Sequence, residues 1–202
     1  MLRSAFALGS TSLLLLTSLA RAADSGLPTY TDAKAAGADF QTQGEYTGDV
    51  TSEGQQKKVG VQVIALGDGK FRAVAYPGGL PGDGWKKGDQ KHSSEGKTEG
   101  GVTTFTGKDR QGRIKDGQLV ISDLSGNQLG TLKKVERKSP TLGAKPPAGA
   151  VVLFDGTSAD NFQGGKMTPE GYLEVGAKSK QEFGSCQLHI EFRTPFMPTA
   201  QG

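Results

Sequence analysis

The stretch KVGVQVIAL (residues 58–66), followed by GDG (67–69) and KFRAVAY (70–76), decides the fold of this chain. Short runs that are apolar or alternate between apolar and polar side chains are typical of β-strands. Asp68-Gly69 suits the turn between two such runs, because Asp and Gly tolerate the positive φ angles of a tight hairpin. The stretch therefore predicts an antiparallel β-hairpin.

The same rhythm of strand and turn continues outward from this hairpin. Turns are expected at Asp116-Gly117 and at Ser125-Gly126-Asn127, and further strands at residues 44–50, 102–106, 112–114, 118–121 and 129–135. Six or seven strands over about a hundred residues predict a small β-sandwich or barrel at residues 40–138. Trp85 ends a Gly/Pro-rich loop at 77–85, and it suits either a lid over the local core or a stacking platform for a sugar.

The first 22 residues have the layout of a secretory signal peptide. Arg3 precedes an apolar stretch with Leu13-Leu14-Leu15-Leu16 at its centre, and Ala20-Arg21-Ala22 fits the cleavage pattern. A membrane anchor is the alternative, but Gly9 and several hydroxyl residues interrupt the run of about 20 apolar residues that a span requires. We expect an exported protein, periplasmic or extracellular, with no membrane span after cleavage and a flexible leader at 23–39.

Charge and composition exclude several classes of function. Removal of Arg3 and Arg21 from a net charge of +3 leaves +1, so the mature chain lacks the excess of cations that nucleic-acid binding depends on. The one cysteine, Cys186, allows no disulfide within the chain. The two histidines, His92 and His189, fall in different expected domains, so a His-rich metal site is not expected. No cofactor is expected either.

A Pro/Gly-rich run at residues 139–149 predicts a linker, and a second domain is expected at 150–202. Strands are predicted there at 151–154, 172–175 and 185–193. The last alternates strictly, with an apolar face of Cys186, Leu188, Ile190 and Phe192 and a polar face of Gln187, His189, Glu191 and Arg193. The polar face is either an ordinary solvent-facing side or a row of groups that hydrogen-bond sugar hydroxyls.

Three segments of this second domain resemble the start of the 3-keto-disaccharide hydrolase family. They are VLFDGT (residues 152–157), GYLEV (171–175) and EFGSCQLHIEFRTP (182–195), and the resemblance spans residues 151–195. It implies a concanavalin-like jelly roll that cleaves glycosidic bonds of 3-keto sugars. Asn161-Phe162 stands where the family usually has Gly-Trp. A two-sheet sandwich needs about a hundred residues, so the expected jelly roll is incomplete and inactive in this chain.

The chemistry that the resemblance implies is an elimination. A keto group at C3 acidifies the hydrogen at C2, and loss of that proton expels the leaving sugar from C1. Glu191 is expected as base or ligand contact, Arg193 as the group that orients or polarises an oxygen, and His189 in support. Gln187 and Asp155 are candidate substrate contacts, although Asp155 also suits a purely turn-forming role. The alternative function is a non-catalytic carbohydrate-binding or surface structural module, and the oligomeric state is left open.

Overall fold

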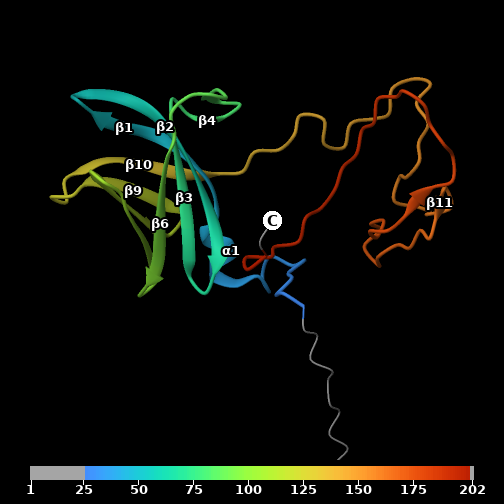
Figure 1. The fold of residues 1–202 in the computed structure, drawn as a ribbon, viewed down its shortest axis with the longest axis horizontal. Helices are drawn as coiled ribbons and strands as arrows, with labels where there is room; N and C mark the ends of the chain where they lie inside the picture. The colour runs from blue at the N-terminus through green and yellow to red at the C-terminus, as the bar shows by residue number, and fades with distance from the viewer. Residues whose placement is uncertain (1–25, 201–202) are drawn as a thin grey trace, which may run out of the picture.

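Eight antiparallel strands close into a barrel in the computed structural model, which describes residues 26–200 (Figure 1). The expected signal peptide lies outside the described residues. The barrel strands are β1 (Gly44–Ser52), β2 (Gln55–Gly67), β3 (Lys70–Pro77), β6 (His92–Glu99), β7 (Val102–Thr106), β8 (Arg110–Lys115), β9 (Gln118–Asp123) and β10 (Gln128–Val135). The minor elements are α1 (Gly37–Thr42), β4 (Leu80–Pro81), β5 (Gly84–Trp85), β11 (Phe162–Gln163) and β12 (Lys178–Ser179).

The strand order β1-β10-β9-β8-β7-β6-β3-β2 is that of an up-and-down barrel. Each barrel strand pairs with its neighbour in the chain, and β1 closes the ring by pairing with β2 on one side and β10 on the other. Closure leaves no free sheet edge. The prediction of a mostly β chain is confirmed, and of the two architectures considered for residues 40–138 the structure has the barrel.

The barrel interior is filled by side chains that alternate inward along the strands. An eight-stranded barrel is only wide enough for its own side chains to fill it. The buried residues include Tyr46 and Val50 from β1, Val61, Val63 and Ala65 from β2, Phe71 and Ala73 from β3, Phe105 from β7, Ile114 from β8, Leu119 from β9 and Leu132 from β10. The barrel is therefore a packed scaffold.

The hairpin turns confirm the prediction made from Asp-Gly pairs. Asp68 and Gly69 have φ angles of 54° and 68°, and Asp116 and Gly117 have 49° and 73°. Two consecutive positive φ angles match the right-handed twist of the flanking strands, which explains why these turns join β2 to β3 and β8 to β9.

Strand β6 was not predicted, because its sequence HSSEGKTE lacks an apolar side. Its inward position Gly96 instead lies over the ring of Phe105, where an added Cβ would come within 2.4 Å of the ring. Thr98 shares a 2.6 Å hydrogen bond with the buried hydroxyl of Thr103. The neighbouring strand thus supplies the apolar volume that β6 lacks.

The loop between β3 and β6 covers part of the outer barrel surface. Leu80 is fully buried there against Gly60, where a Cβ would lie 2.5 Å from the Leu80 nitrogen. Trp85 packs edge-on against Tyr76 at 5.1 Å between ring centroids, and its indole N–H donates to the Gln90 carbonyl at 3.1 Å. Trp85 therefore covers Tyr76, which agrees with one of its two predicted roles, that of a lid over the local core.

The segment expected as a flexible leader is partly structured. Residues 31–36 form turns that lead into α1, and Ala36 is buried in the core. The Asp39 carboxylate of α1 accepts a 3.1 Å hydrogen bond from the Gly69 amide in the β2–β3 turn. This packing could not be read from the sequence, because its partners lie 30 residues or more along the chain.

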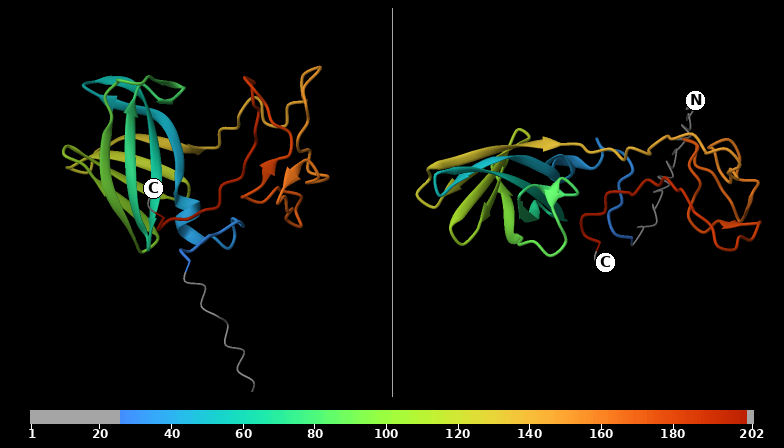
Figure 2. Two further views of the ribbon diagram at one scale, coloured as in Figure 1. Left: turned by 45° about the vertical axis from the view of Figure 1, so that its right-hand side comes forward. Right: turned by 90° about the horizontal axis from the view of Figure 1, so that it is seen from above.

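Residues 150–193 lie to one side of the barrel, and the chain then returns to it (Figures 1 and 2). The predictions of strands at 151–154, 172–175 and 185–193 are wrong: none of these runs forms a regular strand. Leu188, Ile190 and Phe192 are all exposed. Alternation makes a segment suited to a sheet, but a strand forms only beside a hydrogen-bonded neighbour. Within residues 26–200, no helix has the length and apolarity needed to span a membrane.

Candidate functional site

Glu191 and His189 form the centre of the polar row expected at residues 185–193. The His189 Nε2 and Glu191 Oε1 atoms are 3.1 Å apart, and both side chains are exposed. Glu191 Oε1 also accepts a 2.5 Å hydrogen bond from the Gly143 amide. The carboxylate is thus oriented by two donors, one from the expected linker and one from its own segment.

The hydrogen bond from Gly143 is the main reason that the pKa of Glu191 lies below its ordinary value, and the hydrogen bond with His189 lowers the pKa further. Hydrogen bonds to a carboxylate favour its charged form. A general base works best when its pKa is near the operating pH. In this arrangement Glu191 is a hydrogen-bond acceptor suited to hydroxyl groups and a weak base.

The other predicted site residues are not gathered around Glu191. The Arg193 guanidinium lies over the Tyr172 ring, 5.4 Å from its centroid, which is a cation–π contact. Asp155 accepts hydrogen bonds from the Thr157 amide and hydroxyl at 2.9 and 2.6 Å, as expected of a turn-forming residue. Gln187 is exposed. The structure therefore brings together only His189 and Glu191 of the five.

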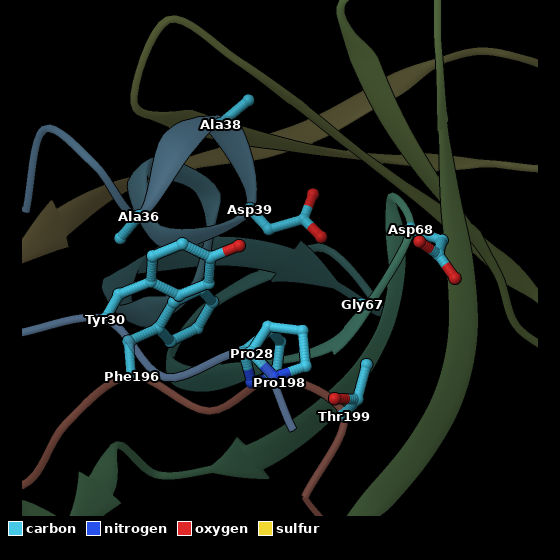
Figure 3. A pocket seen from close by; sticks show the side chains of 10 residues that line it. All are labelled: Pro28, Tyr30, Ala36, Ala38, Asp39, Gly67, Asp68, Phe196, Pro198 and Thr199. Carbon is cyan, nitrogen blue, oxygen red and sulfur yellow. The ribbon is translucent and has the colours of Figure 1, made fainter. Parts of the chain in front are cut away.

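A second candidate site, missed by the sequence analysis, lies at one end of the barrel (Figure 3). We define the barrel-end groove as the surface between residues 28–30, α1 and the β2–β3 turn, and the tail as residues 194–200, which lie in it. Phe196 of the tail is buried against Tyr30 and Phe40, with ring centroids 6.0 and 5.3 Å apart. The apolar run PFMP at 195–198 was the only sequence signal for it.

Two cavities flank the tail in this groove. One, of about 180 Å³, is lined by residues that include Pro28, Asp39, Pro198 and Thr199. The other, of about 320 Å³, lies on the side of Phe40, Ile64 and Met197. Neither cavity includes a residue of the 185–193 row, so the polar row and the groove are separate surfaces.

No group of three or more His, Cys, Asp or Glu side chains is placed to hold a metal ion within residues 26–200. His92 begins β6 in the barrel, whereas His189 lies in the extended C-terminal region. The thiol of Cys186, which the alternation placed on the apolar face of the expected strand, is exposed.

The fold and its surfaces define an up-and-down antiparallel β-barrel protein with an extended C-terminal region that returns to the barrel. Comparison with protein-family models, with curated proteins and with solved structures finds no match.

Proposed function

We propose that this chain is an exported, sugar-handling protein of the 3-keto-disaccharide hydrolase type, with the barrel as its structural scaffold and residues 150–200 as its sugar-contacting part. The observation that supports it is the oriented carboxylate of Glu191, held by the Gly143 amide with His189 at 3.1 Å. An exposed, ionised carboxylate beside an imidazole is suited to pairs of sugar hydroxyls. A jelly roll that begins at residue 150 belongs to the same proposal, and it requires residues 185–193 to gain strand neighbours that they do not have in the conformation described.

We expect binding without turnover from the conformation described. Elimination needs a base of suitable pKa and a group that polarises the C3 carbonyl. Here hydrogen bonding lowers the pKa of Glu191, and the contact shown for Arg193 is with the Tyr172 ring and not with His189 or Glu191. Both features favour contact with a sugar over proton abstraction.

The test is calorimetric titration of the full chain with a 3-keto-glucoside and with the same glucoside carrying a C3 hydroxyl. The proposal expects preferential binding of the 3-keto sugar, weakened about tenfold by Glu191→Gln, because the charged acceptor of the sugar hydroxyls is lost. Glu182→Gln is the matched control, because Glu182 is also exposed and lies outside the row.

The second candidate is a non-catalytic carbohydrate-binding or surface structural module. The exposure of the whole polar row, from Gln187 to Arg193, favours it. Equal affinity for the two glucosides would select this candidate over the hydrolase type. If neither sugar binds, or if Glu191→Gln and Glu182→Gln bind as the unmodified chain does, the proposed site is wrong.

A further inference from the structure

The tail occupies the barrel-end groove in the manner of a bound peptide. The Tyr30 amide donates to the Phe196 carbonyl at 2.9 Å, and the Phe196 amide donates to the Tyr30 carbonyl at 2.8 Å. The two residues form an antiparallel β-bridge that belongs to no named strand. The same exchange of two main-chain hydrogen bonds holds extended peptides on sheet edges, and here one residue pair outside the barrel strands makes it.

Different side chains of the tail contact different parts of the barrel-end groove. The Phe196 ring lies in a slot between Tyr30 and Phe40 and meets the Phe40 ring edge-on, at 69° between the ring planes. Pro198 and Thr199 follow along the cavity wall, and the Thr199 methyl meets Gly67, where a Cβ would lie 2.6 Å away. The groove therefore receives an aromatic residue in the slot, a half-buried side chain beside the second cavity, and then a proline on the wall of the first cavity.

The region of the chain that connects the barrel to the tail contributes no buried residue to the core. After Leu132, the next buried residue along the described chain is Phe196. A long connection with few contacts gives the tail only a moderate effective concentration at the groove, because that concentration falls as the connecting chain lengthens. A second peptide can therefore compete with the tail.

The fit of the tail is incomplete. Among residues 26–200 the buried Thr199 hydroxyl has no hydrogen-bond partner, and cavities of about 180 and 320 Å³ remain on either side of the tail. Buried polar groups are normally satisfied, and an unsatisfied one weakens the complex that buries it. An occupant with larger side chains, and without a buried hydroxyl at the position of Thr199, would fill the groove more completely.

We infer that the barrel-end groove is a recognition site for an extended peptide of another polypeptide that carries an aromatic-x-Pro sequence, and that the tail occupies this site in cis. Main-chain bonds to Tyr30 hold the peptide, and the slot between Tyr30 and Phe40 reads its aromatic residue. The site lies on a surface different from the proposed sugar contacts and does not depend on them.

The experiment measures binding of a labelled peptide with the tail sequence, RTPFMPTA, to the full-length chain by fluorescence anisotropy. The Phe196→Ala variant removes the aromatic anchor of the cis tail and leaves the groove intact, so the peptide should bind this variant at least about tenfold more tightly than the unmodified chain. Phe192→Ala is the matched control: it truncates an exposed phenylalanine four residues earlier and should leave the affinity unchanged. A peptide with Ala in place of its Phe should not bind.

A measurement on the unmodified chain covers the case in which Phe196→Ala does not fold. With peptide in excess, hydrogen exchange should show the Phe196 amide losing protection while the Tyr30 amide, now paired with the peptide, stays protected. No binding to either form, or equal binding to Phe196→Ala and Phe192→Ala, overturns the inference. A dimer of the unmodified chain that the peptide dissociates would make the tail of a second copy the occupant and would overturn the assignment to another polypeptide.

Discussion

Alanine substitution of two phenylalanines, one in the barrel interior and one in the exposed C-terminal region, should change the free energy of unfolding by very different amounts. Phe71 of β3 is 1% exposed inside the barrel, whereas Phe192 is 78% exposed. Removal of a buried phenylalanine ring costs about 3–5 kcal/mol, from lost burial and from the cavity that remains. The same change at an exposed position usually stays within about 0.5 kcal/mol. We expect Phe71→Ala to lose most of the stability of the barrel and Phe192→Ala to lose almost none.

The assay is urea unfolding followed by the fluorescence of Trp85, the only tryptophan in the chain. Trp85 packs on Tyr76 at the outer barrel surface, so its signal reports the barrel. Hydrogen exchange of residues 185–193 gives an independent reading of the C-terminal region, where we expect amides without protection. Far-UV circular dichroism verifies that both variants retain the β signal before urea is added.

Two results would refute this reasoning. A loss below about 1 kcal/mol for Phe71→Ala would mean that the barrel interior is not packed around this ring, since such rings carry large burial energies. Protected amides at residues 185–193, together with a loss above about 2 kcal/mol for Phe192→Ala, would mean that this segment is a strand in a folded sheet.

Three further predictions concern the barrel. The hydrogen bond from Arg137 is the main cause that lowers the pKa of Glu45, so Glu45 stabilises the fold above its ordinary pKa of 4.5, and this contribution disappears as the pH falls through the lower folded pKa. Glu45→Gln should cost about 1 kcal/mol in urea unfolding at pH 7 and progressively less as the pH is lowered below 4.5. Gly60→Ala should destabilise the barrel by about 1–3 kcal/mol, because its Cβ would meet the Leu80 backbone, and an unchanged urea midpoint would contradict the packing of the β3–β6 loop. Burial raises the pKa of Tyr46 from 10.0 to about 12, so the unfolded chain loses this proton first and stability should decline as the pH rises from 10 to 12; Tyr46→Phe should be less sensitive to pH over that range.

Much of the barrel follows from local sequence. Alternating side chains in β2 and β3 and the Asp-Gly pairs between strands carry their own conformational preference, so hairpins were predictable without any partner. Strand β6 could not be predicted from its own sequence, because the apolar side chain that fills the barrel interior beside it is Phe105 of the next strand. The choice of a barrel over a sandwich also lay beyond the sequence, because closure depends on the pairing of β1 with β10, more than 75 residues apart.

The candidate surfaces were predictable only in part. The approach of His189 to Glu191 follows from their spacing of two along an extended chain, since such side chains project to the same side. The Gly143 amide that orients Glu191 comes from 48 residues away. The barrel-end groove joins residues 28–30, α1 and the tail, and no periodicity in any of these segments marks it.

The amino-acid sequence alone determined that this chain is built from β-hairpins and where their turns lie, because φ preferences and the alternation of side chains act between near neighbours. Only the tertiary structure decided which strands close the barrel, that residues 185–193 remain outside a sheet, and that the tail lies beside Tyr30. Those outcomes depend on contacts between distant residues, and a distant contact forms only if burial and hydrogen bonding exceed the entropy lost in closing the loop.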